Sequence, residues 1–183
     1  GYSPEEFANI TIDKEGGFDK AKQTLDKSDL KPSNYHPIPV KTNSAGEKYS
    51  KILNKIFIND YDFKDYDRAT NIYWPGNKLG HGREDVIKFW NSLKSILSEI
   101  KFKIEHVGYL DEPNRNPRAS IRWSLEGIHS KDSKDYGKKT NSNLSFIGIN
   151  HAELNPYGVI KEWVLFDEVA IWKQILMNKN KNG

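Results

Sequence analysis

One carboxylate near the end of the chain has neighbours that suit acid and base chemistry. Asp167 directly follows the apolar run Trp163 to Phe166, and Trp172 comes five residues later. An aspartate among aromatic rings loses hydration, which raises its pKa toward the range in which a general base works. Asp167 is therefore the first candidate for a catalytic residue. The alternative is a helix cap, because Asp is favoured where a strand passes into a helix.

Two histidines could share a proton with this carboxylate. Residues two apart lie on the same face of a strand, and the apolar-rich faces of three predicted strands carry Asp167, His151 and His129. If those faces point into the protein, the three side chains point inward together. His151 is then predicted to act with Asp167, since imidazole titrates near neutral pH. A packed, hydrogen-bonded role is the alternative for both histidines.

A second carboxylate lies on the same segment as Asp167 but on its other face. Glu162 alternates with Asp167 along the predicted strand and shares its face with Val164 and Phe166. The prediction for Glu162 is therefore a structural ion pair with a Lys or Arg.

Aromatic residues could line a pocket for a flat or aromatic ligand. The candidate ligand-binding residues are Trp74, Trp90, Tyr109, Trp123, His129 and Trp163. Packing in the core is the alternative for most of them. Trp74, before Pro75, and Tyr109, at a strand end, are expected to lie near the rim of a pocket.

The chain lacks the residues that several kinds of chemistry require. The chain has no Cys, which excludes disulfides, thiolate metal ligands and Cys nucleophiles. It has no G-x-S-x-G turn and no phosphate-binding loop. His106, His129 and His151 lie on separate predicted strands without the spacing of a zinc site, so we expect no metal and no cofactor.

Charge and hydropathy limit the kinds of partner that the chain is expected to have. The 183 residues include 28 Lys and Arg against 25 Asp and Glu, a formal net charge of +3 that is spread along the chain. Nucleic acid is not expected as a partner, because no basic stripe is visible. A membrane is not expected either, because no apolar run approaches the roughly 20 residues of a membrane span.

Periodicity predicts the elements that position these residues. Apolar residues recur at helical spacing in Tyr49, Ile52, Leu53, Ile56 and Phe57, and later segments alternate with a period of two. Helices are predicted at residues 3–10, 47–57, 62–68, 84–99 and 168–177, and strands at 71–74, 102–108, 119–129, 144–154 and 159–166.

This order predicts an α+β fold in which one curved antiparallel sheet wraps over helices and leaves a conical, mostly apolar cavity. Residues 1–45 are predicted to be an irregular N-terminal arm or linker, extended from residue 31. Residues 46–178 are predicted to form the domain and 179–183 a disordered tail. The chain begins with Gly1 and no Met, which indicates a trimmed sequence. The compartment is therefore left open, with the cytoplasm as the default.

Three segments resemble the SnoaL-like polyketide cyclase family of the nuclear transport factor 2-like superfamily. They are Gly80-His81-Gly82-Arg83-Glu84 before an apolar helix, residues 122–129 with the Tyr136-Gly137 loop, and residues 148–151 followed by residues 158–167, which contain Glu-Trp and end in Asp. Lys138 to Asn141 replace the Pro-Pro-Thr-Gly-like turn of that family. The resemblance implies the cone-shaped α+β fold and, in its cyclases, an Asp that removes a proton next to a carbonyl.

Two hypotheses about function follow. In the first, the chain binds a small organic molecule, polyketide-like or aromatic, in an apolar cone and catalyses cofactor-free cyclase or isomerase chemistry with Asp167. In the second, it is a non-catalytic ligand-binding domain, or an interaction domain that forms a homodimer through the sheet face. The fold alone does not choose between them.

Overall fold

The computed structural model describes residues 1–22, 39–58 and 63–181. Four helices, one short 3-10 turn and six strands follow one another in this part of the chain. In order they are α1 (Pro4–Lys14), α2 (Ala45–Phe57), η2 (Phe63–Asp65), β1 (Tyr66–Trp74), β2 (Lys78–His81), α3 (Gly82–Lys94), β3 (Leu97–Leu110), β4 (Arg118–His129), β5 (Asn143–Asn155), β6 (Gly158–Phe166) and α4 (Glu168–Lys181).

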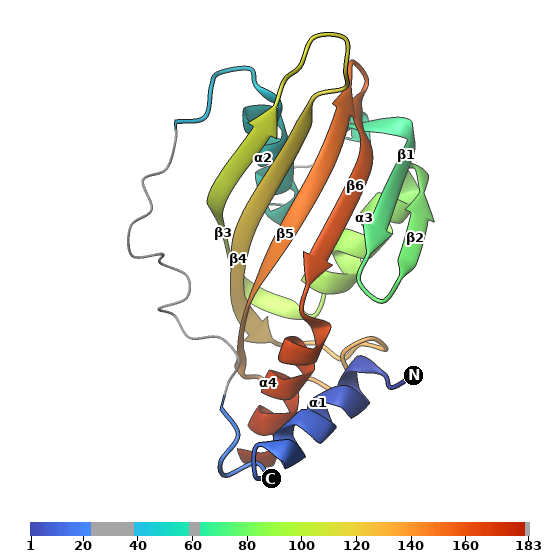
Figure 1. Cartoon of the computed structure of the whole chain (residues 1–183). Helices are drawn as coiled ribbons and strands as arrows, with labels where there is room; N and C mark the ends of the chain where they lie inside the picture. The colour runs from blue at the N-terminus through green and yellow to red at the C-terminus, as the bar shows by residue number, and fades with distance from the viewer. Residues whose placement is uncertain (23–38, 59–62, 182–183) are drawn as a thin grey trace.

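The strands form one sheet in the order β2-β1-β6-β5-β4-β3. All neighbouring strands are antiparallel except β1 and β6, which run parallel, so the sheet is mixed where the sequence predicted a purely antiparallel one. Figure 1 shows α2 and α3 on one face of the curved sheet, and α1 and α4 together at one end of it. The predicted α+β architecture, a curved sheet wrapped over helices, is confirmed.

Helix α2 forms where the helical spacing predicted it. The Ser44 hydroxyl accepts a hydrogen bond from the Glu47 amide at 3.2 Å and caps the first turn. The apolar stripe from Tyr49 to Phe57 is buried against the sheet.

Several boundaries differ from the prediction, and α4 runs to Lys181, into residues predicted to be a disordered tail. Residues 63–74 form η2 and β1 in place of a helix over 62–68, whose first residue lies outside the described part. Residues 78–81 form β2, because Gly80 lets that strand pack closely on α3: an added Cβ there would lie 2.6 Å from the Phe89 ring. Helix α3 ends at Lys94 and not at residue 99, because Leu97 already pairs with His129 in the sheet.

The N-terminal segment packs against the last helix. Helix α1 starts with the capping box of Ser3 and Glu6, and it extends the helix predicted over residues 3–10 as far as Lys14. Its Ile12 packs with Met177 of α4. The Lys173 side chain is 2% exposed, and its Nζ lies 2.6 Å from a Glu15 carboxylate oxygen. Part of the predicted linker, residues 31–38, lies outside the described residues.

Aromatic rings fill the space between the sheet and helices α2 and α3. Phe57 stacks on Phe102 with ring centroids 4.0 Å apart, and Trp74 meets Trp90 edge to face at 5.1 Å. Trp123 is fully buried at the centre of this cluster. No helix among the described residues is long and apolar enough to span a membrane.

Candidate functional site

A carboxylate lies inside the aromatic core. Glu162, on the inner face of β6, is 0% exposed and accepts hydrogen bonds at both oxygens. Its Oε1 accepts from the Tyr49 hydroxyl in a short hydrogen bond and from Asn150 Nδ2 at 3.1 Å. Its Oε2 accepts from the Tyr66 hydroxyl at 3.2 Å and from Trp90 Nε1 at 3.4 Å. We call these five residues the Glu162 cluster.

Each donor of the cluster comes from a different element. Tyr49 lies on the buried stripe of α2, Trp90 on that of α3, Tyr66 at the start of β1 and Asn150 on the inner face of β5. Asn150 also donates to the Tyr49 hydroxyl at 2.8 Å. Its Oδ1 accepts from Trp123 Nε1 at 2.7 Å. The amide therefore links Glu162 to the centre of the aromatic core.

The environment of Glu162 is neutral apart from its own charge. Among the described residues, none of the ion pairs includes it. Burial raises the pKa of Glu162, and the hydrogen bonds from Tyr49, Trp90, Tyr66 and Asn150 oppose that rise. Burial, followed by the nearby Glu162 carboxylate, raises the pKa of Tyr49 and of Tyr66, so both phenols stay protonated donors.

This arrangement has the parts of an acid/base site. A carboxylate whose pKa is raised by burial takes up a proton more readily than one in water and can return it. Two phenolic hydroxyls beside it can donate hydrogen bonds to an oxygen that becomes negative during a reaction.

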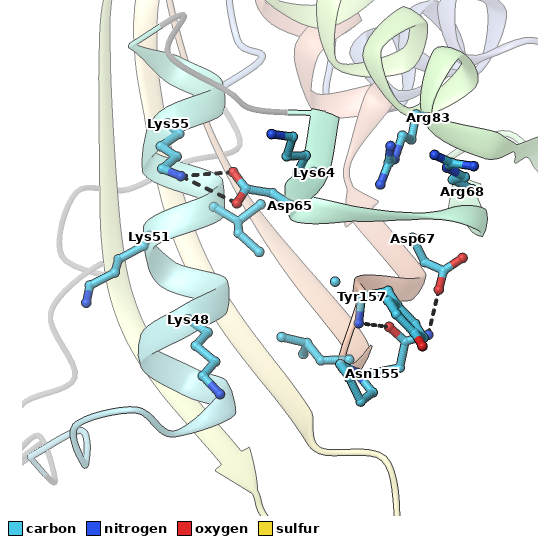
Figure 2. Close-up of a pocket in the computed structure, with 14 residues that line it drawn as sticks. Lys48, Lys51, Lys55, Lys64, Asp65, Asp67, Arg68, Arg83, Asn155 and Tyr157 are labelled. Carbon is cyan, nitrogen blue, oxygen red and sulfur yellow. Dashed lines mark hydrogen bonds and ion pairs between the residues drawn. The ribbon is translucent and has the colours of Figure 1, made fainter.

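An open hollow is lined by residues that neighbour the same two tyrosines in the chain. Its volume is about 1030 Å³, and it runs between α2, the start of β1 and the turn that joins β5 to β6 (Figure 2). Lys48 and Ile52 flank Tyr49 along α2 and line the hollow, and Asp65 and Asp67 flank Tyr66 and do the same. We call the hollow the basic groove, after the six Lys and Arg among its lining residues.

Comparison with solved structures identifies the architecture, whereas neither a family model nor a curated protein matches the sequence. A SnoaL-like polyketide cyclase from Agrobacterium tumefaciens superposes with a TM-score of 0.56 at 13% identity, over 73% of this chain and 99% of that one. IdmH from Streptomyces antibioticus gives 0.57 at 12% identity, over 70% and 96%. TsrD from Streptomyces laurentii gives 0.57 at 11% identity, over 75% and 98%.

The chain has the SnoaL-like fold. This confirms the resemblance in residues 80–84, 122–129 and 158–167 as far as the architecture is concerned. At identities of 11 to 13%, the likeness establishes the fold alone, because this fold carries many unrelated activities. What the chain does has to be argued from its own residues.

Asp167 and His151 do not point into the SnoaL-like cone. Asp167 is exposed, and its Oδ1 accepts from the Ala170 amide at 2.9 Å, so it caps α4. His151 is exposed on the outer face of β5, where its ring centroid lies 5.3 Å from that of Trp163. The prediction that these faces of β5 and β6 point inward is wrong, and the catalytic role given to the two residues stays a prediction.

The outer face of the sheet explains the error. It carries large apolar side chains, with Leu165 at 64% exposure and Ile149 at 45%, so both faces of each strand are apolar and apolarity does not identify the buried one. The inner face of β6 carries the buried Glu162. A prediction that assumes that charged side chains face solvent therefore assigns the wrong faces of β5 and β6 to the interior.

The remaining candidate residues divide between the core and the surface. Trp74, Trp90 and Trp123 are buried and pack against one another's rings, and Trp163 stacks on Tyr73 on the outer face. The Tyr109 hydroxyl accepts from the Lys41 amide at 3.3 Å. The inward prediction for His129 is confirmed: it is fully buried, and burial lowers its pKa.

Sequence reasoning missed most of the Glu162 cluster. Tyr49, Tyr66 and Asn150 were not candidates, and the ion pair predicted for Glu162 is wrong, because no Lys or Arg reaches it among the described residues. A carboxylate on the same strand face as Val164 and Phe166 was the available signal. Within the described part of the chain, no three His, Asp or Glu side chains are placed to hold a metal ion.

Proposed function

We propose that this SnoaL-like chain catalyses cofactor-free proton transfer on a small organic carbonyl compound, with Glu162 as the group that takes and returns the proton. The observation that carries the proposal is a carboxylate that is 0% exposed, without a cationic partner among the described residues, and held by four uncharged donors. Such a carboxylate binds a proton more readily than one in water.

The reaction needs two functions, and the cluster has residues for both. Glu162 removes a proton from the carbon next to the carbonyl, and the electron pair of that C–H bond moves onto the carbonyl oxygen as an enolate. A phenol of Tyr49 or Tyr66 donates a hydrogen bond to the enolate oxygen. Return of the proton to another carbon gives an isomer. Attack of the enolate carbon on a second carbonyl closes a ring, and Glu162 gives its proton to the new alkoxide.

The basic groove supports this proposal as a route to the cluster. Tyr49 and Tyr66 bind Glu162, and in the chain each lies between residues that line the groove, so α2 and the start of β1 contribute both to the groove wall and to the cluster. A substrate in the groove would meet the cluster when α2 and the start of β1 move apart.

The direct test is exchange of carbon-bound hydrogen in heavy water. A panel of enolisable ketones is incubated with the protein in D₂O, and loss of the proton signal next to the carbonyl is followed by NMR. We expect at least one ketone to exchange faster with the protein than without it. Asp167→Asn should leave that rate unchanged, because Asn caps a helix about as well as Asp.

A specific surface favours interaction with a second copy as another candidate function. On the outer face, Leu165 lies directly opposite Ile149, and Trp163 lies opposite both His151 and Tyr73. Three of these side chains are at least 37% exposed, namely Tyr73, Ile149 and Leu165. A contiguous apolar patch on a sheet face is typical of a protein interface.

Charge placed in that patch should change the oligomeric state. If the patch joins two copies, the natural chain is a dimer by size-exclusion chromatography with light scattering, and Leu165→Lys is a monomer, because a buried ammonium opposes association. Tyr157→Lys is the matched control, since Tyr157 is 75% exposed on the β5–β6 turn. A natural chain that stays monomeric at high concentration would count against this candidate.

A further inference from the structure

The geometry points to a binding site for a small organic anion in the basic groove, a molecule that carries a carboxylate or phosphate group beside an apolar body. This inference does not use proton transfer at Glu162, so either proposal can fail alone.

In the folded chain, basic side chains that are spread along the sequence come together in the groove. Six basic and two acidic side chains are among the described residues that line the groove, a formal charge of +4: Lys48, Lys51, Lys55, Lys64, Arg68 and Arg83 against Asp65 and Asp67. The whole chain carries only +3, so the rest of it sums to −1. The sequence-based expectation of evenly spread charge therefore does not hold in space. A hollow lined mainly by one sign of charge concentrates ligands of the opposite sign.

The two acidic residues of the groove already have partners of their own. Asp65 accepts from Lys55 Nζ at 3.1 Å and 3.4 Å. Asp67 accepts from Asn155 Nδ2 at 2.6 Å and from the Ala69 amide at 2.8 Å (Figure 2). In the described part of the chain, Lys48 and Arg68 have no ion-pair partner.

Arg83 is held in place by a hydrogen bond from its Nε. Its Nε donates to the Tyr66 carbonyl oxygen at 2.6 Å, which fixes the half-buried guanidinium against the start of β1. Neither terminal nitrogen has a hydrogen-bond partner among residues 1–22, 39–58 and 63–181. Those two nitrogens form a planar pair of donors, which matches the two oxygens of a carboxylate or phosphate.

A second guanidinium lies on the same wall. The Arg68 carbonyl oxygen would be 3.6 Å from a Cβ added at Gly82, the residue before Arg83, so the two arginines adjoin through the backbone. Across the groove, Lys48, Lys51 and Lys55 follow one face of α2 (Figure 2). Like charges repel one another in such an arrangement, and an anion between them removes that repulsion.

Apolar groups in the groove indicate an organic ligand. Ile52 and Leu154 are buried in its wall, and Pro156 and Tyr157 form a lip at which the Tyr157 ring is 75% exposed. A molecule with both an acid group and an apolar body satisfies both kinds of contact. A nucleic acid would need a basic surface longer than the groove, whereas the charge outside it sums to −1.

The test compares three probes of similar shape by calorimetric titration at low salt: phenyl phosphate, phenylacetate and the uncharged phenylacetamide. We expect both anions to bind and the amide to bind about tenfold more weakly or worse, since charge-assisted hydrogen bonds to Arg are lost. Exchanging Lys48 and Arg68 together for Gln should weaken anion binding about tenfold or more. Both side chains are exposed, so this variant should fold normally. The ratio of the two anion affinities shows which acid group the groove prefers.

Two variants serve as controls. Arg115→Gln removes an exposed guanidinium outside the groove and should change anion affinity less than twofold. Glu162→Gln should leave anion binding intact even if it abolishes proton transfer. The inference is overturned if the amide binds as well as the anions, if Arg115→Gln weakens binding as much as the groove variant, or if neither anion binds at about 10 mM. A single-stranded oligonucleotide that binds more tightly than both anions would also overturn it.

Discussion

Exchanging Gly148 for Ala is expected to remove a large part of the stability of this protein. Gly148 lies on the inner face of β5, and a Cβ added there would lie 2.1 Å from Trp123 Cζ2 and 2.5 Å from two further atoms of the same ring. The ring cannot retreat, because Phe57, Trp90 and Phe146 surround it and its Nε1 is bonded to Asn150. Overpacking of this kind costs about 3 kcal/mol or more, a large part of the roughly 5–15 kcal/mol that stabilises a domain.

Denaturant unfolding followed by circular dichroism measures this effect. Gly108→Ala is the matched control, since the nearest atom to a Cβ at that strand position is 3.9 Å away. The control should be neutral or slightly stabilising, by up to about 1 kcal/mol. Combining Gly148→Ala with Trp123→Leu should restore part of the lost stability. If Gly148→Ala alone stays close to the natural protein, the described packing of the cone is incorrect.

Replacing Glu162 with Gln should produce the largest effect on activity. For any ketone that exchanges its proton in the presence of the protein, we expect the rate to fall about a hundredfold to ten-thousandfold, the usual contribution of a general base. Gln keeps the size of Glu162 but cannot take a proton. Glu162→Asp keeps the carboxylate and should retain part of the rate.

Stability and pH dependence separate a catalytic loss from a structural one. Unfolding measured alongside shows whether Glu162→Gln remains folded, and the rate of the natural protein should rise with pH as Glu162 ionises. A folded Glu162→Gln that exchanges ketone protons at the natural rate would remove Glu162 from the mechanism. Loss of the rate in Asp167→Asn with its retention in Glu162→Gln would return the role to Asp167.

The sequence predicts the architecture well because periodicity reports burial over many residues. The stripe of α2 and the inner face of β4, with Ile121, Trp123 and His129, follow the apolar pattern and are confirmed. The same reasoning fails on β5 and β6, since both faces of these strands carry apolar side chains. On β6 the buried carboxylate of Glu162 distinguishes the inner face, and the assumption that charged side chains face solvent places it on the wrong side.

The candidate site depends on contacts that sequence spacing does not encode. Glu162 meets Tyr49 across 113 positions and Trp90 across 72, so the cluster appears only when α2, α3 and the sheet are packed together. The basic groove is similar: its cations come from α2, η2, β1 and α3 and form no run along the chain. Local patterns predict the elements, and only their packing brings these side chains together.

The ionisation of Glu162 also affects stability. Burial raises the pKa of Glu162 above its ordinary value of 4.5. Between the unfolded and the folded pKa, the folded protein binds more protons than the unfolded chain. The contribution of Glu162 to stability is therefore full below the unfolded pKa and is lost as pH rises through the folded one.

A pH titration of the Glu162 carboxyl carbon by ¹³C NMR tests the central claim most directly, with Glu162→Gln used to assign the signal. If the carboxylate is buried among uncharged donors and poised for proton transfer, its titration midpoint lies above the ordinary value of 4.5. A midpoint at or below that value would show that the carboxylate is hydrated or paired with a cation, which would contradict the account.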